Sequence, residues 1–311
     1  MASLSISSES KKKSFTKQQI HYDIILGQGR GDPVYEMEDL ENSHIRYAVK
    51  KISKSTCKCS ALPNEIEIYK QLRNCSRVLK LIDFFEDKWN WYIVLEKAKC
   101  NLLQEMMNYA QDQQLKHCKN VNSKEELHKK LLFPLPVVKS YVKAMVVALM
   151  QCHEHNVIHL DLKLENLFVL EQEEKEGDDK KNEINNEGDL LRLGDFGSSH
   201  CGSISLSAQG TVHTFAPEVA VRFFGRATMD SPLITRSADL WSLGVCTLEL
   251  MQNSNVYEIN DEEKVMRGEY TMPKHLDKDA ADFVQKLLQK DPTKRMSLEN
   301  CLKHPFLSSL Q

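Results

Sequence analysis

Segments rich in apolar, aromatic and β-branched residues recur along the first hundred residues and are typical of β-strands. There are four: YDIIL (22–26), IRYAVKKI (45–52), VLKLIDFF (78–85) and NWYIVLE (90–96), of which the YAVKKI stretch alternates like a strand. Neighbouring side chains of a strand point to opposite faces, so a period of two is typical of half-buried strands. One predicted helix, at about residues 63–73, interrupts them. We therefore expect a small, sheet-rich lobe at residues 21–97.

From Leu102 onward the apolar residues follow the spacing of helices instead. One stripe at helical spacing comprises Val138, Tyr141, Val142, Met145, Leu149 and Cys152. The segment ADLWSLGVCTLELM (238–251) is apolar nearly all round, which predicts a buried helix. Together the two halves predict an α+β fold of two lobes, in which a larger, mainly helical lobe spans residues 98–309.

Three polar segments lie outside these patterns. Residues 1–20 are predicted to be a disordered leader, and residues 107–133 are polar and rich in lysine. Residues 171–189 hold nine acidic residues against three lysines. We interpret the two internal segments as inserts that run over the surface, mobile or disordered, because they have little apolar material to bury.

Composition narrows the class of protein further. The 311 residues are 41% apolar and 27% charged with a net charge of -3, so no global basic field argues for nucleic acid. The start of the chain has no apolar signal core, and no run appears long enough to span a bilayer. The nine cysteines form no regular framework and are predicted to be reduced thiols of an intracellular protein, cytoplasmic or nuclear.

Candidate chemistry begins with the glycine-rich stretch LGQGRGDPV, residues 26–34. Its nearest template is the phosphate loop G-x-G-x-x-G-x-V, which Gly27, Gly29 and Val34 match. Asp32 takes the place of the third glycine, and an acid beside phosphates is unfavourable by charge. Glycine patterns of this kind are common, so the stretch alone leaves open a phosphate loop or an ordinary turn.

A charged pair is predicted between the strand YAVKKI and the helix that follows it. Glu65 lies on the same helical stripe as Ile68, Tyr69 and Leu72, which we expect to face inward. A glutamate on an apolar face needs a partner, because an unpaired buried charge is costly. Lys50 is the natural candidate, and the pair would hold the ammonium on a phosphate oxygen.

A second cluster of polar residues interrupts the apolar stretch VIHLDLKLENLFVL (157–170). Here Asp161 is placed to accept a hydroxyl proton, Lys163 to neutralise a moving phosphoryl group, and Asn166 to bind a metal. Asp195 ends a later predicted strand in LRLGDFGSS. Magnesium prefers a few carboxylate and amide oxygens together with substrate phosphates, so Asn166 and Asp195 would make such a site.

In this order the motifs resemble those of eukaryotic protein kinases. YAVKKI is similar to the family's V-A-I-K strand and HLDLKLEN to its H-R-D-L-x-x-x-N loop. DFG and APE are complete, and DLWSLG and DPTKRMSLENCLKHPF resemble later helices. The match runs from about residue 21 to 309, and the order and spacing of the set are highly specific. The resemblance implies the bilobal protein-kinase fold and identifies LGQGRGDPV as the loop over the nucleotide phosphates.

The resemblance also implies cofactors and roles. ATP and Mg²⁺ are expected, with Lys50 on the α- and β-phosphates, and Asp161, Lys163 and Asn166 in catalysis. Asn166 and Asp195 would hold the metal. The implied ATP-binding residues are Leu26, Gly27, Gly29, Val34, Ala48, Lys50, Glu65, Leu95, Glu96, Ala98 and Phe168. Asp32 and Pro33 depart from the family's pattern, which puts ATP affinity in doubt because this backbone closes less freely.

Four structural contacts are implied in the same way. The family's internal apolar stack would consist of Tyr69, Leu81, His159 and Phe196. Asp239 would anchor that stack through the backbone of the catalytic loop. Glu218 would pair with Arg295, and the hydroxyl of Thr211 would bridge Asp161 and Lys163.

The implied substrate is a protein with a serine or threonine acceptor. Lys163 in DLK, and Gly210 and Thr211 ahead of APE, resemble serine/threonine kinases. The loop HLDLK is similar to that of myosin light chain kinases and their calmodulin-regulated relatives, which leaves the branch open. No regulatory partner can be identified from the sequence.

Two rival interpretations are weighed against a kinase. A pseudokinase would serve as a binding or scaffold module, and Asp32 is the best support for it. Such proteins usually lose one of three residues, but Lys50, Asp161 and Asp195 are all present. A kinase of small molecules fits poorly, because APE and the segment before it build a shelf for a peptide.

Regulation is predicted to differ from that of many relatives. Most kinases have an arginine between the catalytic-loop histidine and aspartate, where it can hold a phosphate on the activation segment. Leu160 occupies this position and has no charge. The segment's five serines are interpreted as plain loop residues: Ser198, Ser199, Ser203, Ser205 and Ser207. We expect activity without phosphorylation of the activation segment.

Overall fold

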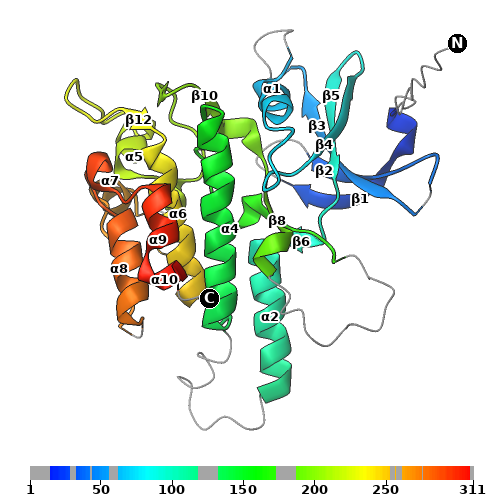
Figure 1. Ribbon diagram of the computed structural model, residues 1–311. Coiled ribbons are helices and arrows are strands. Elements are labelled where there is room, and N and C mark those ends of the chain that lie inside the picture. Colours follow the sequence, from blue (N-terminus) through cyan, green and yellow to red (C-terminus); the bar gives the residue numbers. More distant parts are fainter. Residues whose placement is uncertain are drawn as a thin grey trace, which may run out of the picture. The chain divides into compact units, whose positions relative to one another are not determined.

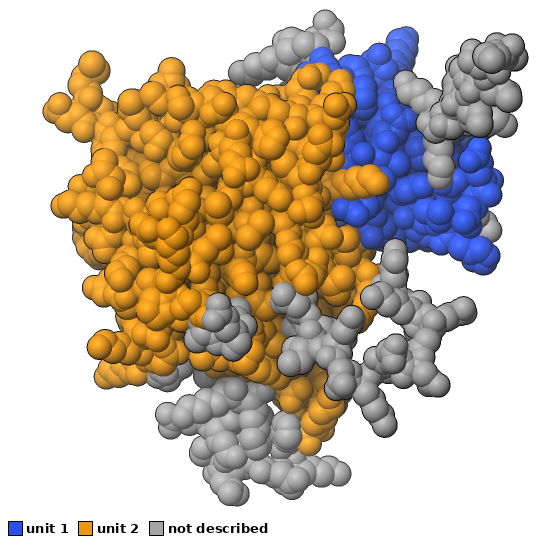
Figure 2. Space-filling view, in the orientation of Figure 1, with its two compact units in different colours: residues 1–63, 81–97 blue, residues 64–80, 98–311 orange. Residues whose placement is uncertain are grey.

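The computed structural model describes residues 15–28, 33–42, 44–55, 62–117, 132–172, 187–252, 256, 261–274 and 276–308. The chain divides into two compact units (Figure 2). The first comprises residues 1–63 and 81–97, and the second comprises residues 64–80 and 98–311. The predicted boundary at 97/98 recurs in this division, but residues 64–80, with the helix expected in the small lobe, group with the second unit.

The first unit is built on a five-stranded antiparallel sheet (Figure 1), in the order β1-β2-β3-β5-β4. Its strands are β1 (Ile20–Gln28), β2 (Pro33–Glu38), β3 (Arg46–Ser53), β4 (Leu81–Glu86) and β5 (Asn90–Glu96). The central strand β3 pairs Lys50 with Val34 of β2 on one side and with Ile93 of β5 on the other. The strand-like segments of the sequence therefore form the predicted sheet, to which β2 adds a strand that the alternation did not reveal.

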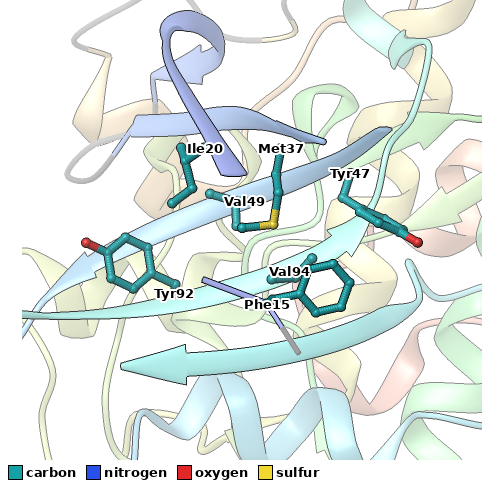
Figure 3. Packing of buried hydrophobic residues seen from close by; sticks show 7 residues of the cluster. All are labelled: Phe15, Ile20, Met37, Tyr47, Val49, Tyr92 and Val94. Carbon is teal, nitrogen blue, oxygen red and sulfur yellow. The ribbon is translucent and has the colours of Figure 1, made fainter. Parts of the chain in front are cut away.

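One face of this sheet carries the core of the first unit (Figure 3). The buried cluster comprises Phe15, Ile20, Met37, Tyr47, Val49, Tyr92 and Val94. Its members on β3 and on β5 are two residues apart, because alternate side chains of a strand share a face. Figure 3 shows the side chain of Met37 reaching toward that of Val49.

The predicted disordered leader is wrong for its last residues. Phe15 is buried, and its ring packs edge-on against Tyr47 with the ring centroids 5.3 Å apart. The short 3₁₀ helix η1 (Lys17–Gln19) follows, and the Thr16 backbone N–H donates to Gln19 Oε1 over 2.7 Å. An aromatic side chain with a core to enter and a capped turn together order this segment. Residues 1–14 lie outside the described residues.

The second unit is mainly helical. Its helices are α1 (Asn64–Gln71), α2 (Leu102–His117), α4 (Leu135–Glu154), α5 (Pro217–Phe223), α6 (Ser237–Gln252), α7 (Glu262–Arg267), α8 (Lys278–Leu287), α9 (Leu298–Lys303) and α10 (Pro305–Ser308). Short strands make three small sheets: β6 (Cys100–Asn101) with β8 (Leu167–Val169) and β9 (Leu191–Leu193), β7 (Val157–Ile158) with β10 (His200–Cys201), and β11 (Ile204–Ser205) with β12 (Ile234–Thr235).

Short 3₁₀ helices occupy the turns of this unit that matter most below. They are η2 (Leu164–Asn166), η3 (Glu187–Leu190), η4 (Phe196–Ser198), η5 (Val212–Thr214) and η6 (Pro292–Lys294). Three of them, η2, η4 and η5, contain or adjoin candidate site residues. The site is therefore carried by turns, and the longer helices hold those turns in place.

Helices α4 and α6 form the core of the second unit. All six residues of the predicted stripe on α4 are buried, and so is every residue of α6 from Ala238 to Met251, which confirms both predictions. Gly244 permits α6 to lie close to the end of α8, since a Cβ there would come within 2.8 Å of Leu288 Cδ2. By length and composition alone α4 is able to cross a membrane, so the prediction that no run reaches that length is wrong, although 56% of its apolar window is buried in the fold.

Both predicted inserts are partly ordered. Residues 107–117 continue α2, stabilised by the side-chain pairs Gln104–Asn108 and Asp112–Lys116 one turn apart, so the expected irregular excursion is wrong for them. The end of the acidic segment forms η3, where Gly188 N–H donates to Ser140 Oγ over 2.9 Å. Residues 118–131 and 173–186 lie outside the described residues.

Candidate active site

The catalytic loop follows β7 and alternates buried leucines with polar residues. Leu160, Leu162 and Leu164 are 5% exposed or less, which fixes the loop to the core. Asp161 and Lys163 alternate with these leucines along the chain. The leucines therefore anchor the loop that carries both polar residues.

Asp161, Lys163 and Asn166 lie together in the structure. Lys163 Nζ is 3.2 Å from Asp161 Oδ2, and Asn166 Nδ2 donates to the same oxygen over 3.1 Å and to the Asp161 backbone carbonyl over 2.8 Å. The other carboxylate oxygen, Asp161 Oδ1, is buried and accepts no hydrogen bond. One oxygen of the carboxylate is therefore held in place, while the other is available to a hydroxyl donor.

Thr211 joins this group through the lysine. Lys163 Nζ donates to Thr211 Oγ1 over 2.7 Å and also contacts Asp161, so the ammonium is the bridge. The expectation that the threonine hydroxyl itself bridges the two residues is corrected in this respect. An ammonium has three donors on a flexible stem and can serve both neighbours at once.

Asp195 occupies a strained turn at the end of β9. Its backbone is left-handed, with φ 59° and ψ 75°, a conformation that costs a residue other than glycine about 1–3 kcal/mol. The Asp195 backbone N–H donates to Tyr69 Oη over 3.2 Å, and Gly194 N–H donates to the Asn166 carbonyl over 3.0 Å. The second bond brings the chain at Asp195 next to Asn166, as the metal-site prediction requires.

The oxygen donors fit a magnesium ion that also binds phosphates. The Asn166 amide nitrogen is engaged with Asp161, which leaves the amide oxygen as the ligand that it can offer. The Asp195 carboxylate would be the second ligand of the type that Mg²⁺ prefers. Among the residues that the structure describes, no group of three His, Cys, Asp or Glu side chains could hold a metal. These two oxygens would therefore need substrate phosphates and water to complete the coordination.

Asp239 holds the backbone of the catalytic loop, which confirms the prediction. Its carboxylate accepts from the N–H groups of His159 over 2.9 Å and of Leu160 over 2.8 Å, and it lies 2.8 Å from His153 Nε2. Burial by itself raises the pKa of Asp239, but the hydrogen bond and charge of His153, together with His159, outweigh it and lower the pKa. Leu160 keeps a left-handed φ of 64° under this restraint.

Three members of the predicted apolar stack are in contact. The rings of Tyr69 and Phe196 lie edge to face with centroids 5.0 Å apart, and His159 meets Phe196 at 5.1 Å. His159 Nε2 also lies 3.1 Å from the Gly194 carbonyl oxygen. The stack therefore links α1, the catalytic loop and the DFG turn. Leu81, the fourth predicted member, belongs to the first unit.

The predicted pair of Glu218 and Arg295 is confirmed as a buried, bidentate ion pair. Two parallel bonds of 2.7 Å join the guanidinium to the carboxylate, and the side chains are 0% and 1% exposed. Arg295 also donates to the Ser237 carbonyl over 2.8 Å and lies over the Trp241 ring. The pair connects α5 to the end of η6, and the bond to Ser237 extends this link to the start of α6.

The expected ATP-binding residues are divided between the two units. Leu26, Gly27, Val34, Ala48, Lys50, Leu95 and Glu96 lie on strands of the first unit, where the ladder pairs Gly27 with Val34 and Ala48 with Leu95. Glu65, Ala98 and Phe168 belong to the second unit, in which Glu65 is buried at 5% exposure. Gly29 lies outside the described residues, and the pairing of Lys50 with Glu65 stays a prediction.

Sequence reasoning missed several polar residues that α6 contributes beside the site. Ser242 donates to the Thr214 carbonyl over 2.8 Å, and Cys246 Sγ lies 3.7 Å from the Leu162 carbonyl oxygen. Glu249 is buried near the end of the same helix. Their spacing of three or four residues within an apolar helix was a signal that could have found them.

The fold and the site together define the class of this protein. Residues 20–307 match the family described as Protein kinase domain, so the chain belongs to that family. It is 30% identical over 295 residues to the Serine/threonine-protein kinase PLK4 of Drosophila virilis, covering 91% of this chain and 32% of that protein.

Other relatives carry the same name. The PLK4 proteins of Drosophila ananassae and Drosophila melanogaster are each 30% identical, over 305 and 295 residues, with 94% and 91% of this chain and 34% and 32% of the relative covered. The chain thus spans about a third of the length of these relatives. The likeness of HLDLK to the calmodulin-regulated branch is not confirmed by these comparisons.

Proposed function

We propose that this chain transfers the γ-phosphoryl group of ATP to serine or threonine hydroxyls of proteins. The proposal rests on the different surroundings of the two oxygens of the Asp161 carboxylate. One oxygen is fixed by Lys163 and Asn166, and the other is buried without a hydrogen bond, where only a donor brought by a substrate would satisfy it. A hydroxyl group is such a donor.

The chemistry of the remaining residues is consistent with this role. Asp161 Oδ1 would orient the acceptor hydroxyl and take its proton, and Lys163, 3.2 Å from the same carboxylate, would neutralise charge on the transferred group. Asn166 and Asp195 would hold Mg²⁺, which when bound would supply charge neutralisation at the phosphates. Catalysis of this type depends mainly on positioning, so the fixed backbone of the loop matters as much as its side chains.

The nucleotide would be bound by the residues that the family resemblance implies. Lys50 would contact the α- and β-phosphates and Glu65 would hold it in place, while Ala48, Val34 and Phe168 would cover the adenine. Supporting this, Val34 and Lys50 are directly paired in the ladder of β2 and β3. Asp32 in the glycine-rich loop predicts weaker ATP binding than an intact loop would give.

The test is a set of three substitutions. Lys50→Met, Asp161→Asn and Asp195→Ala should each reduce phosphoryl transfer to a generic protein substrate by at least about a hundredfold, while the melting temperature of the protein stays near that of the wild type. Asp230→Asn, at an exposed position in the second unit, is the matched control and should retain full activity. Wild-type turnover in any of the three variants would refute the role of that residue.

The competing proposal is a pseudokinase that binds without chemistry. It predicts that the wild-type protein binds ATP and Mg²⁺ but shows no more transfer than Asp161→Asn. Radiolabelled ATP in an autophosphorylation assay separates the two, because a shared background in both proteins would favour the binding module. The intact set of Lys50, Asp161 and Asp195 favours the enzyme.

We also propose that activity does not require phosphorylation of the activation segment. Leu160 offers no charge to a phosphate, and two of the segment's five serines have structural roles. Ser199 is buried and donates to the His159 carbonyl over 2.9 Å, and the fully buried Ser205 donates to the Ser207 carbonyl over 3.0 Å. The test is therefore confined to the three other serines.

The variant Ser198→Ala/Ser203→Ala/Ser207→Ala keeps Thr211 and should turn over within about tenfold of the wild type after phosphatase treatment. A larger loss, above about 1.4 kcal/mol in the barrier, would contradict the proposal and indicate another cation as the phosphate receptor. The six described cysteines are all free thiols, which supports the further proposal that the protein works inside the cell.

A further inference from the structure

The activation segment and the chain after α5 form a short β-ribbon on the second unit. β11 (Ile204–Ser205) pairs with β12 (Ile234–Thr235) in antiparallel register, with Ser205 opposite Ile234. Both residues of this pair are fully buried, so the ribbon lies against the core through the face that carries them. The neighbouring residues on each strand point to the other face, because side chains of a strand alternate.

The outward face of the ribbon is apolar. Leu206 is 83% exposed, Leu233 is 47% exposed and Ile204 is 43% exposed, and we call these three residues the ribbon face. Single exposed apolar residues are common, but several on one face form a patch, and such patches mark interaction sites. The ribbon face adjoins the chain between α5 and β12, which Figure 1 shows as a loop at the outer edge of the second unit.

Three arginines lie on the chain from the end of α5 to the end of β12. Arg222 Nη2 donates to the Ser231 carbonyl over 3.3 Å, and Ser231 precedes Leu233 of the ribbon face by two residues. Arg226 is exposed just beyond α5, and Arg236 is exposed directly after β12. Cationic side chains therefore accompany the apolar face at both ends of this short stretch.

None of these three arginines forms an ion pair within the part of the chain that the structure describes. Four other arginines do pair with carboxylates: Arg46, Arg77, Arg267 and Arg295. Within residues 199–236 the acidic side chains are Glu218, which is paired with Arg295, and the exposed Asp230. The positive charge along this stretch is therefore not balanced locally.

Arg222 also has an unused donor. Its Nη1 nitrogen is buried and has no hydrogen-bond partner among the described residues, although the side chain as a whole is half-buried. Buried polar groups are nearly always hydrogen-bonded, and an unsatisfied cation costs more than an unsatisfied neutral group. A carboxylate is the acceptor whose geometry matches the planar guanidinium. This nitrogen is a second, independent indication of an anionic ligand.

We propose that the ribbon face and its three arginines dock a segment of the protein substrate that is rich in acidic and apolar residues. Apolar side chains of the substrate cover the ribbon face, and its carboxylates pair with the guanidinium groups. The apolar contact supplies area removed from water, and the charges select an acidic partner over a basic one. Docking involves no covalent step.

The place of β11 in the chain favours a substrate as the partner. β11 belongs to the activation segment, and Thr211, whose hydroxyl accepts from Lys163, follows Leu206 by five residues. Five residues reach at most about 18 Å when fully extended. A substrate docked on the ribbon face therefore needs only a short stretch of its own chain to bring a hydroxyl to Asp161. This assignment to substrates rests on the proposed kinase function, whereas the binding of an acidic, apolar peptide does not.

The binding test uses a fluorescent peptide of alternating glutamate and leucine, followed by fluorescence anisotropy with the full chain. Peptides of alternating lysine and leucine, and of alternating glutamate and serine, examine the charge and the apolar contact separately. We expect the glutamate–leucine peptide to bind at least about tenfold more tightly than either of the others, and more weakly as the salt concentration rises. Equal affinity for the three peptides would overturn the proposal.

Two double variants locate the binding on the protein. Arg226→Glu/Arg236→Glu reverses two charges, and Leu206→Ser/Leu233→Ser removes most of the ribbon face. Each should weaken binding of the glutamate–leucine peptide by at least about tenfold, while the melting temperature stays near that of the wild type because all four positions are exposed. Unchanged affinity in either double variant would refute the docking surface.

Matched controls come from elsewhere in the second unit. Arg73→Glu changes an exposed arginine that also lacks an ion pair among the described residues, and Leu115→Ser changes a leucine that is 77% exposed on α2. Both should bind the peptide as the wild type does. A loss in either control as large as that in the double variants would show that the effect is not specific to the ribbon face.

Two other occupants are outcomes of the same set of variants. A dimer in sedimentation that dissociates in Leu206→Ser/Leu233→Ser would indicate a second copy of this chain on the ribbon face. Vesicles containing phosphatidylserine that bind the wild type but not Arg226→Glu/Arg236→Glu, without binding of the peptide, would indicate a membrane surface. Either result would overturn the assignment to a substrate.

A kinetic measurement separates this proposal from the kinase function. A serine peptide linked to the glutamate–leucine segment should have a lower KM than the unlinked serine peptide at unchanged kcat, and both double variants should abolish the difference. If the segment binds but the wild type transfers no phosphoryl group, the docking surface stands and the kinase function fails. If transfer occurs and the segment leaves KM unchanged, the kinase function stands and the docking of substrates fails.

Discussion

Two carboxylates on the same face of α6 behave in opposite ways. Asp239, in the first turn, is fully buried, yet its pKa is lowered. Glu249, near the last turn, is 3% exposed, and its pKa is raised to about 8. Burial raises the pKa of both acids, so burial alone cannot explain the difference.

The difference comes from the partners that each carboxylate has. Asp239 accepts two backbone hydrogen bonds and faces His153, and together these favour its charged form. Glu249 has one oxygen without a partner and the negative Glu165 nearby. Donors and neighbouring charges therefore decide whether a buried acid works as an anchor or stays neutral.

The largest loss of stability is expected when the charge of Asp239 is removed. Asp239→Asn leaves the His153 ring without its carboxylate and replaces one acceptor of the loop by a donor. We expect the free energy of unfolding to fall by about 3–5 kcal/mol, which is the usual cost of breaking a buried charge pair. Denaturant unfolding measures it, and Asp279→Asn on the exposed face of α8 should change stability little. A loss below about 1 kcal/mol in Asp239→Asn would contradict the anchor.

The corresponding substitution near the other end of the helix, Glu249→Gln, should raise the stability of the protein at high pH instead of lowering it. A pKa of about 8 against an ordinary value of 4.5 means that folded Glu249 binds a proton more tightly than the unfolded chain does. Its contribution to stability is therefore present at low pH and is lost as the pH rises toward 8, by at most about 1.4 kcal/mol per pH unit.

Glu249→Gln removes this dependence and should be more stable than the wild type at pH 8, with little difference at pH 5. Unfolding curves at both values decide the point. A variant that is less stable at pH 8 than at pH 5, by the same margin as the wild type, would show that another group causes the decline.

A smaller loss of stability is expected from changing Ser242, a neutral polar residue on the same face of α6 as Asp239 and Glu249. Ser242→Ala removes the hydroxyl that donates to the Thr214 carbonyl over 2.8 Å. We expect a loss of about 1 kcal/mol, because both groups are buried and the carbonyl is left without this donor. Thr247→Ala is the control on the same helix, since its hydroxyl bonds only to the Leu243 carbonyl of its own helix. Equal losses would indicate that the contact with η5 has no special value.

The smallest effect on stability should come from a deletion between β8 and β9, outside α6. Deleting residues 173–186 should alter stability by less than about 0.6 kcal/mol, because the cost of closing a loop depends weakly on its length. A deletion extended through residue 189 should cost more, since Arg77 donates to the Gly188 carbonyl over 2.6 Å and pairs with Asp189. Melting temperatures of the two deletions, compared with the wild type, test whether this boundary is correct.

The parts of the fold that could be predicted from the sequence rest on local patterns. The stripe of α4, the apolar α6 and the alternating strands follow from periodicity, and each of these segments is long enough to be distinctive. Asp161, Lys163, Asn166 and Asp195 were found because a motif fixes their spacing. Their spatial grouping follows from strand pairing, since β8 and β9 pair directly and bring the two motifs together.

The parts that were missed depend on contacts far apart in the sequence. Phe15 is ordered by Tyr47, and the polar start of the chain concealed this partner. Strand β2 begins with Pro33 and carries two glutamates, and it is a strand because β1 and β3 pair with it on both sides. The raised pKa of Glu249 results from burial and from the charge of Glu165 in η2, a neighbour far away in the sequence that no local pattern in α6 could indicate.

The attachment of the catalytic loop to Asp239 has a consequence for the motions of this domain. The amide hydrogens of His159 and Leu160 are bound to a carboxylate at the core of the molecule, although they belong to a turn. Exchange with solvent deuterium then requires α6 to move away, and not merely the loop to open. These two amides should exchange as slowly as those of a central helix, so the loop is part of the slowest-opening cooperative unit of the domain.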